Sequence, residues 1–581
     1  MPAKPSGEIK TSTIKSPQKN GDIYILERQT LYDPVKKYNK VLSTKLVAKI
    51  PKGSEIPVPT RPKRASGANN DKNPEIPTSR RMHVGMMDII DHIGKTSGID
   101  NGIYANTDIG SAQKIISLAR YLLATNGQTL PGIQTWQYNH PLPYEDGISE
   151  DVYHDLFVRI GRDEELQQNF FRSRCAGLNE TDALAYDSST ISTYSKNQIE
   201  ARYGFNKASD GLKTIKLLTL YSIETRQPLA FTKQPGNLPD VITITNAIKQ
   251  LTALGVNTTE IVTDNGYYSE QNLSELLQAG FDFITLAKPS LKWIKPEVNS
   301  HSEELANIRS ACPFDTNTHG VCVLLKHDFD KVRKYASQKK GTLKGDTETF
   351  SRRLYLHIYF NAARQIEEKH VFEHNLLELK TQIEDGISID ELSESAQNKV
   401  KKYLSIRHWG KKNTVSFKDE EIALANRYHG YFVLVSNKEK DPFECLRKYR
   451  KRETIESFFE AMKQHADGTR TRVWDTDTLR GRMFVQFIAL CYYEYFGEEI
   501  RNLKQSLGLK TGEPEHDQKA IIDAEKKLKS WLNNTPLYLQ LQWFDTVESV
   551  EVSTKLKKQR WTTEITSRDR LYLEKLGIII R

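Results

Sequence analysis

Alternation of apolar and polar residues marks the first part of the chain as a β-hairpin. The runs DIYILER (22–28) and KVLSTKLVAKI (40–50) have the period of a strand and flank the turn-prone LYDPVKKYN. Residues 51–81 are rich in Pro, Ser, Asn and Lys, a composition typical of a linker. We therefore expect a disordered basic tail over residues 1–20 and a basic hairpin with its linker over residues 21–81.

Helical spacing of apolar residues dominates from residue 82 to residue 178. Ser111 is a candidate N-cap for one of these helices, because a serine hydroxyl can accept a bond from a free backbone N–H. Four segments carry the helical pattern: HVGMMDIIDHIG, SAQKIISLARYLLATNG, SEDVYHDLFVRIG and DEELQQNFFRSRC. The prediction is a helical N-terminal domain over residues 82–178, which could recognise DNA or serve packing alone.

Strands alternate with helices over residues 179–289. The segments predict three strands, a helix, a strand, a helix and a last strand: ALAYDSST, IKLLTLYSI, PLAFTKQ, PDVITITNAIKQLTALG, EIVTDNG, SEQNLSELLQAG and FDFITLAK. This order makes an α/β sheet of mixed direction and is expected of a ribonuclease H-like core. Asp187 and Asp264 stand at the ends of the first and fourth strands, so their carboxylates should project from one edge of the sheet.

The regular alternation breaks after residue 289. Residues 290–440 mix strand-like runs with charged helical stretches and predict an inserted subdomain, mostly β or α+β, because a compact core needs no connection of that length. The second part of the core is expected over residues 441–505. A helical C-terminal region, a possible dimerisation element, is expected over residues 506–581. The fold class is therefore α/β with a helical domain at each end of the core.

Composition and charge narrow the class of protein. The chain has 581 residues, 38% hydrophobic and 27% charged, and its five cysteines are scattered without a C-x-x-C pair. No apolar run approaches the ~20 residues that span a bilayer, and the basic N-terminus lacks the apolar stretch of a signal peptide. We expect a cytoplasmic, nucleoid-associated protein with no membrane contact.

The positive charge is concentrated at the start of the chain. Residues 1–64 hold 14 Lys and Arg against five acids, so 14 − 5 = +9, which equals the net charge of the whole chain. A basic arm on a neutral body suggests a polyanionic partner, most simply nucleic acid. The alternative is a solubilising tail.

The segment YRKRETIESFFEAMK, residues 449–463, combines a phenol, two cations and a carboxylate. On one α-helix at roughly 100° per residue, Tyr449, Arg452, Glu456 and Lys463 fall within about 60° of one another. Four apolar residues occupy the neighbouring face: Ile455, Phe458, Phe459 and Met462. Intrahelical ion pairs on a solvated face are the alternative, and Glu453 and Glu460 share that face, so helical geometry alone does not choose the working carboxylate.

Two strand-end aspartates and one helical glutamate suit a pair of divalent cations. Mg²⁺ prefers oxygen ligands, and two ions ~3.5–4 Å apart stabilise both the attacking and the leaving oxygen of a phosphodiester. The chemistry indicated is phosphoryl transfer, in which positioning and charge neutralisation supply most of the rate.

These residues together resemble a known family. Asp187 in YDSST, Asp264 in TDNGYY and the Y-x2-R-x3-E-x6-K arrangement from Tyr449 to Lys463 look like the DDE transposases of bacterial insertion sequences, in the superfamily named for the Tyr-Arg-Glu-Lys signature. The order of aspartate, aspartate, insertion and glutamate also agrees. The resemblance covers residues 187–463 and extends loosely to the N-terminal regions.

The resemblance implies a function and a set of site residues. Asp187, Asp264 and Glu456 would be the catalytic triad that binds two Mg²⁺ ions, with Mn²⁺ able to substitute. Tyr449, Arg452 and Lys463 would contact phosphates at the transposon end. The activity implied is cut-and-paste transposition: a homodimer binds double-stranded DNA at terminal inverted repeats, cleaves it, typically through a hairpin, and joins it to target DNA.

Two further sets of residues, tryptophans and arginines, are candidates for DNA contacts. Relatives hold a flipped base against an aromatic residue of the insertion, for which Trp409 in RHWGKKN is our candidate and Trp293 the second. A tryptophan can equally be a core residue. Four arginines beyond the signature form a candidate basic cluster, with a solvated helix end as the alternative: Arg470, Arg472, Arg480 and Arg482.

Three other functions compete with transposition. A non-catalytic DNA-binding regulator derived from a transposase predicts loss of a metal ligand or a truncated basic arm, and neither is seen. A ribonuclease H-like nuclease without strand transfer is disfavoured by the insertion and the full signature. A paired-carboxylate hydrolase leaves Arg452 and Lys463 unexplained.

Overall fold

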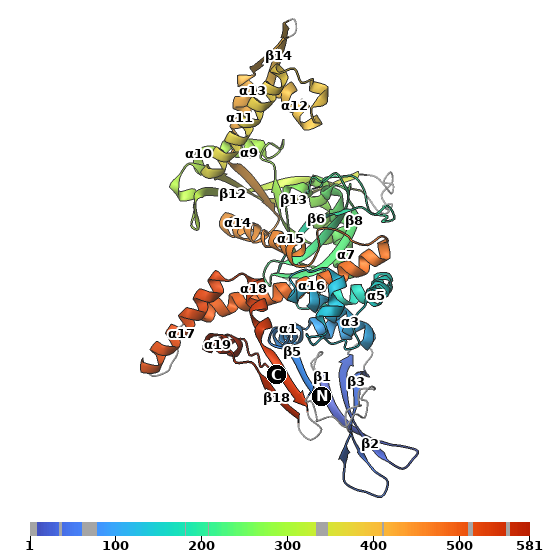
Figure 1. Cartoon of the computed structure of the whole chain (residues 1–581). Coiled ribbons are helices and arrows are strands. Elements are labelled where there is room, and N and C mark those ends of the chain that lie inside the picture. The colour runs from blue at the N-terminus through green and yellow to red at the C-terminus, as the bar shows by residue number, and fades with distance from the viewer. Residues whose placement is uncertain are drawn as a thin grey trace, which may run out of the picture. The chain divides into compact units, whose positions relative to one another are not determined.

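The computed structural model describes most of the chain as two compact units (Figure 1). The described residues are 9–33, 38–60, 78–179, 182–206, 208–332, 347–409, 412–508, 515–553 and 558–580. The first unit comprises Met1–Leu178, Ser188–Asn237 and Ile455–Arg581, and the second comprises Asn179–Asp187 and Leu238–Thr454. Strand β6 (Ala183–Thr193) begins in the second unit and ends in the first.

A mixed sheet forms the centre of the second unit. Its strand order there is β11-β12-β13-β16-β10-β9-β6, with β6, β9 and β10 parallel to one another and the strands from β10 to β11 antiparallel. The strand bounds are β9 Glu260–Thr263, β10 Asp282–Ala287, β11 Ala311–Cys312, β12 Asp315–Val332, β13 Thr347–Asn361 and β16 Tyr431–Ser436. The fold class is α/β with a mixed sheet, as predicted.

Helices connect and flank these strands. The main ones are α7 (Ile244–Ala253) and α8 (Glu270–Ala279), which link the parallel strands, and α11 (Ala362–Glu384), α12 (Glu394–Tyr403), α13 (Asp419–Asn426) and α14 (Pro442–Lys451). Short helices α9 (Lys295–Ser300) and α10 (Ser302–Leu305) precede β11. The predicted helix from Pro239 begins as a 3-10 turn over Asp240–Thr243 before α7.

The segment predicted as an inserted subdomain mostly extends the central sheet. Strand β16 pairs with both β10 and β13, so apolar strands that are far apart in the sequence share one sheet. A separate small core exists between α11, α12 and the hairpin of β14 (Leu404–Trp409) and β15 (Lys412–Phe417). That core consists of Leu379, Ile383, Val400, Leu404 and Val415. The sequence pattern showed the added strands but not that they continue the core.

Helix α16 (Thr476–Ser506) is the central element of the first unit. It is apolar around most of its circumference and is buried along most of its length, as such a helix must be. Helix α5 (Glu150–Arg162) crosses it closely at Gly161 and Gly481. A Cβ at Gly161 would lie 1.9 Å from the backbone oxygen of Asp477, so only glycine allows this approach.

The remaining helices of the first unit include three of the four segments predicted as helical over residues 82–178, and α5 is the fourth. They are α1 (Gly85–Thr96), α2 (Ile99–Tyr104), α3 (Ile109–Ala124), α4 (Ile133–Trp136), α6 (Glu164–Cys175), α15 (Thr454–His465), α17 (Glu515–Asn534), α18 (Leu537–Trp543) and α19 (Ser567–Lys575). Ser111 is not the N-cap of α3. Asp108 holds that position, and its carboxylate accepts a bond from the backbone N–H of Ser111.

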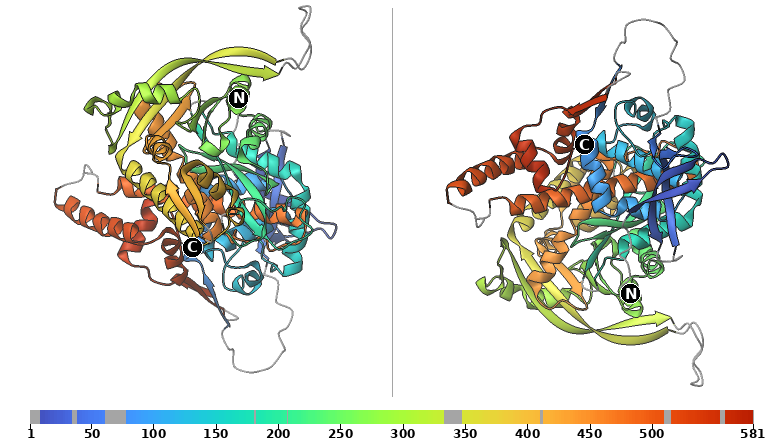
Figure 2. Two further views of the ribbon diagram at one scale, coloured as in Figure 1. Left: turned by 90° about the horizontal axis from the view of Figure 1, so that it is seen from above. Right: turned by 90° about the horizontal axis from the view of Figure 1, so that it is seen from below.

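Three groups of strands complete the first unit. One sheet has the order β1-β2-β3-β4, and its blue strands are visible in Figure 2. A second has the order β18-β17-β5. The third is the part of the mixed sheet in which β7 lies beside β6, and β8 lies beside β7. The bounds are β1 Ile9–Pro17, β2 Ile23–Asp33, β3 Tyr38–Ile50, β4 Val58–Pro59, β5 Thr78–His83, β7 Lys213–Ser222, β8 Gln227–Pro235, β17 Glu548–Ser553 and β18 Lys558–Thr562.

Two predictions about the N-terminal region need correction. The expected disordered tail is wrong for Ile9–Pro17, which pairs along its whole length with β2. Its composition is mostly polar, so backbone pairing with a neighbour, rather than its own pattern, makes it a strand. The end of the expected linker is also wrong, because Thr78–His83 pairs with β17. Residues 61–77 lie outside the described part of the chain.

No helix among the described residues has the length and apolar character needed to cross a membrane. Even α16 carries charged residues through its sequence, including Glu494 in its second half.

Glu494 is a buried carboxyl on α16. Its side chain accepts a hydrogen bond from the Tyr221 hydroxyl at 3.1 Å, and the residue is 8% exposed. Burial raises the pKa of Glu494 from 4.5 to about 7, an effect that the Tyr221 hydrogen bond and the charge of Arg501 only partly offset.

We expect Glu494→Gln to stabilise the protein at pH 8 but not at pH 4.5. Between these limits the folded carboxyl keeps its proton while the unfolded one loses it, so stability falls as pH rises from about 4.5 to about 7. Glutamine removes this loss, which is worth about 1–3 kcal/mol. Thermal melts from pH 4.5 to 8 measure the effect, with Glu499→Gln on the same helix as control. Parallel pH profiles for parent and Glu494→Gln would contradict the assignment.

Candidate active site

Two aspartates lie at the same edge of the neighbouring parallel strands β6 and β9 in the second unit. Strands β6 and β9 pair Ala183 with Glu260 and Ala185 with Val262. The same register continued by two residues places Asp187 opposite Asp264. Asp264 directly follows the end of β9, as predicted, but Asp187 lies within β6, which continues to Thr193.

Each aspartate carboxylate accepts a hydrogen bond from a tyrosine, and Asp187 accepts one from an arginine as well. The Asp187 carboxylate accepts hydrogen bonds from Arg452 Nη1 at 3.2 Å and from the Tyr267 hydroxyl at 3.3 Å. The Asp264 carboxylate accepts one from the Tyr449 hydroxyl at 3.0 Å. The Arg452 guanidinium also lies over the Tyr449 ring, 5.4 Å from its centroid. Both aspartates therefore belong to one network of hydrogen bonds and ring contacts.

Burial gives this network its electrostatic character. Arg452 is 5% exposed, so its charge needs the Asp187 carboxylate as a partner, and removing either one leaves a buried charge uncompensated. Burial, reinforced by the charge of Asp264, raises the pKa of Tyr449 well above its ordinary value. Tyr449 therefore remains a protonated hydrogen-bond donor at neutral pH.

Helix α14 is anchored to β9 by a second ion pair. Lys448 Nζ lies 3.0 Å from Glu260 Oε2 and 3.1 Å from Glu439 Oε2. Burial lowers the pKa of Lys448, but hydrogen bonds and charge from the two carboxylates outweigh it and raise that pKa overall. Since Tyr449 is the next residue, this anchor fixes the backbone that presents its hydroxyl to Asp264.

The predicted single helix from Tyr449 to Lys463 is wrong. Helix α14 ends at Lys451, and the backbone N–H groups of Arg452 and Glu453 bond to carbonyls three residues back, as in a tight turn. The Thr454 hydroxyl donates to the Lys451 carbonyl at 2.8 Å, and α15 begins there. The four signature residues therefore do not form a stripe on one helix.

The second half of the signature belongs to the first unit. Glu456 is exposed in the first turn of α15, and Lys463 is partly exposed in its last turn. The apolar face is buried as predicted: Ile455, Phe458, Phe459 and Met462. Because Glu456 lies beyond the boundary at Thr454, its place as a third ligand beside the two aspartates remains a prediction.

Each of the four arginines predicted as a basic cluster beyond the signature has an acidic partner. Arg482 is 5% exposed and pairs with Asp467 at 2.6 Å, so its interpretation as a surface phosphate contact is wrong. Each of the other three also has an acidic partner in the first unit: Arg470 with Asp210, Arg472 with Asp467 and Arg480 with Glu164. A DNA contact by Arg470, Arg472 or Arg480 remains a prediction.

The structure describes the side chain of one of the two tryptophan candidates, Trp293, but not that of Trp409. Trp409 is the last residue of β14, and its side chain lies outside the described part of the structure. The Trp293 indole donates to the Tyr268 hydroxyl at 3.0 Å and its ring lies 4.5 Å from that of His327. Trp293 is thus packed against neighbours in the second unit, and a base-stacking role for either tryptophan remains a prediction.

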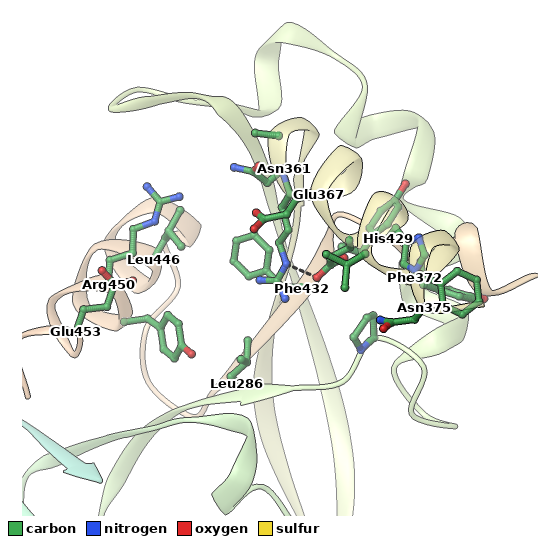
Figure 3. Close-up of a pocket in the computed structure, with 18 of the residues that line it drawn as sticks. Leu286, Asn361, Glu367, Phe372, Asn375, His429, Phe432, Leu446, Arg450 and Glu453 are labelled. Carbon is green, nitrogen blue, oxygen red and sulfur yellow. Dashed lines mark hydrogen bonds and ion pairs between the residues drawn. The ribbon is translucent and has the colours of Figure 1, made fainter. Parts of the chain in front are cut away.

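An open cavity of about 940 Å³ adjoins the end of α14 and the turn at Glu453 in the second unit (Figure 3). Figure 3 shows Arg450 and Glu453 on one side of it and Phe372 and His429 on the other. Tyr449 also lines it. Further aromatic side chains in its wall are Tyr428, Tyr431 and Phe432. The cavity can therefore present ring faces to a bound group close to the residues that contact the aspartates.

One group of candidate metal ligands among the described residues is separate from the aspartates. Ligand atoms of His83, His140 and Asp545 lie within 4.8 Å of one another. The two imidazole rings stack at 4.7 Å with an interplanar angle of 14°, so an ion in the plane of one ring lies out of the plane of the other. Both Nδ1 atoms bond to backbone carbonyl oxygens. Such bonds are also common for metal-ligating histidines, so it is the stacking of the two rings that favours a structural cluster over a metal centre.

Comparison with known proteins identifies the class. Residues 179–492 match the family described as the transposase DDE domain, which is more than half of the chain. The chain belongs to this family of transposases, whose DDE domains use divalent metal ions. The carboxylate oxygens of Asp187 and Asp264, level on neighbouring strands, are the ligand type that such hard cations prefer.

One solved structure that the chain resembles is a cryo-EM structure of the piggyBac transposase synaptic complex with hairpin DNA. The identity is 11%, the TM-score is 0.35, and the alignment covers 81% of this chain and 84% of that chain. No curated protein sequence matches the chain.

Tyr267 is a site residue that sequence reasoning missed. It lies in TDNGYY, three residues beyond Asp264, and the 3-10 turn Asn265–Tyr267 directs its hydroxyl to Asp187. Only the pairing of β9 with β6 brings a residue near position 264 to one at position 187.

We expect Tyr267→Phe to slow metal-dependent DNA cleavage by about 10-fold, because one hydrogen bond to a carboxylate is lost. Tyr268→Phe is the matched control, since the neighbouring hydroxyl bonds to Trp293 instead. Cleavage time courses at saturating metal measure both variants. Equal rates for Tyr267→Phe and Tyr268→Phe would show that Tyr267 does not position Asp187.

Proposed function

We propose that this protein is a cut-and-paste DNA transposase of the bacterial insertion-sequence type, acting as a homodimer on the terminal inverted repeats of its own element. The observation that carries the proposal is that Asp187, in β6, and Asp264, directly after the paired strand β9, are each bonded by a residue of the Tyr-Arg-Glu-Lys signature. Such an element acts at DNA, so we infer a nucleoid-associated location in a prokaryotic cell.

The acidic residues have a metal-binding role in this proposal. Asp187, Asp264 and Glu456 would hold two Mg²⁺ ions, or Mn²⁺ in their place. Bound metal would supply charge neutralisation at the scissile phosphate and a more acidic water. The chain's own contribution is to hold the two carboxylates at one edge of β6 and β9 and to pair Asp187 with the buried Arg452 guanidinium.

The signature cations and phenol have a phosphate-binding role. Arg452 offers planar N–H donors, Tyr449 a hydroxyl that stays protonated, and Lys463 a flexible ammonium. Contacts of this kind fix the position and register of a DNA strand without reading its sequence. Inverted-repeat recognition therefore has to come from other parts of the chain, with the basic N-terminal sheet as the first candidate.

Cleavage of the second strand would proceed through a hairpin. In that step the freed 3′-OH attacks the opposite phosphodiester, which strains the terminal base pairs and expels a base from the stack. The cavity beside Tyr449 supports this route, because its aromatic wall offers stacking surfaces for an unpaired base.

The decisive test of the function uses the element's own ends. Purified protein with Mg²⁺ should nick and join DNA that carries the inverted repeats, and Glu456→Gln should reduce both by at least about 100-fold. Glu460→Gln is the matched control, an exposed glutamate one turn further along the same helix. Full activity of Glu456→Gln would contradict the assignment. Cleavage without joining would indicate a nuclease, and binding without cleavage a regulator.

The hairpin route predicts a specific product. On a denaturing gel, DNA labelled at the transposon end should pass through a covalently closed species of twice the single-strand length before linear product accumulates. Direct appearance of linear ends, with the closed species absent at all times, would replace the hairpin by separate cleavage of each strand.

A further inference from the structure

Two segments of the first unit run side by side beyond the elements that carry catalytic residues. Residues 192–199 lie at and beyond the end of β6, and residues 470–476 follow α15. Parallel bridges join Ser192 to Arg470 and Asn197 to Asp475. The Gln198 side chain donates to the Val473 carbonyl at 2.7 Å. The two segments therefore form one ordered surface of the unit.

Large apolar side chains project from this surface into solvent. We define the ring surface as Tyr194, Ile199, Tyr203, Phe205 and Trp474, with exposed fractions of 71%, 71%, 71%, 76% and 70%. The loop that carries Tyr203 and Phe205 folds back on the first segment, since Asn206 Nδ2 lies 3.4 Å from Ser192 Oγ. Side chains of this size are normally buried, so five exposed ones on neighbouring segments call for a partner.

Cations accompany the rings. The Arg470 guanidinium lies 5.5 Å from the centroid of Tyr194, and Lys213 Nζ lies 5.6 Å from that of Tyr203. Arg470 is held in place by an ion pair with Asp210. Lys196, on the first of the two segments, and Arg202, just beyond it, are exposed. Rings interleaved with cations match a partner that has flat bases and a phosphate backbone.

We propose that the ring surface binds DNA with unstacked bases, and that this DNA is the target into which the element is inserted. The inference rests on the proposed function. Stacking of bases on aromatic side chains tolerates any sequence, which suits a target but not inverted repeats that must be recognised. Tyr194 directly follows the end of β6, the strand that carries Asp187.

The test replaces three rings and measures binding without catalysis. The variant Tyr203→Ala, Phe205→Ala, Trp474→Ala removes side chains that are each at least 70% exposed, so the fold is retained. The control Tyr138→Ala, Trp561→Ala removes exposed rings of the same unit elsewhere. Fluorescence anisotropy in EDTA compares a single strand of about 30 nucleotides with inverted-repeat duplex.

We expect single-strand binding to weaken at least about 10-fold in the triple variant, with duplex binding within about twofold of the parent. Joining of precleaved ends to plasmid DNA should fall in parallel, while end cleavage and the control variant stay unchanged. Unchanged single-strand binding would overturn the proposal. So would conversion of a dimer to a monomer on sedimentation with DNA binding retained, which would assign the surface to a protein partner.

Failure of the proposed function would give a different pattern. If the parent protein neither cleaves nor joins its ends, transposition is refuted by that result alone. Single-strand binding is measured in EDTA and does not depend on cleavage. Loss of that binding in the triple variant would still support a DNA surface, and its retention would still refute one.

Discussion

The parallel register between β6 and β9 is the constraint on which the rest of the site depends. It sets Asp187 and Asp264 level on adjacent strands, and a shift by one residue would turn one of them to the other face of the sheet. Helix α14 then contributes Tyr449 to Asp264, and the turn after it contributes Arg452 to Asp187. The ion pair of Lys448 with Glu260 links the same helix to β9.

The buried cation gives the site its sensitivity. Arg452 is 5% exposed, so burying its ion pair with a carboxylate costs desolvation free energy, and removing one partner also destabilises the fold. Such a pair is therefore weak evidence for stability. It makes physical sense where an ionised carboxylate must be kept at a fixed place. Arg452 lies in the turn between α14 and α15. Its guanidinium contacts Asp187 from this turn and not from within a continuous helix.

Much of this arrangement was predictable, and the exceptions share a physical cause. Strand periodicity located β6 and β9 and therefore both aspartates, and apolar spacing identified the buried face of Phe458 and Met462. Helical periodicity could not reveal the break at Arg452, because the residues there are all good helix formers. Long-range pairing decided the rest: Tyr267 reaches Asp187 through the sheet, and Arg482 is buried because Asp467 neutralises it.

Metal binding by the two aspartates tests the central claim most directly. Electron paramagnetic resonance of Mn²⁺, titrated into protein bound to its end DNA, counts the bound ions without requiring turnover. Asp187→Asn and Asp264→Asn should each weaken Mn²⁺ binding by about 10-fold or more, while Asp282→Asn on the neighbouring strand β10 leaves it unchanged. Mn²⁺ affinity that is the same in all three variants and the parent would contradict the assignment of Asp187 and Asp264 as the metal site.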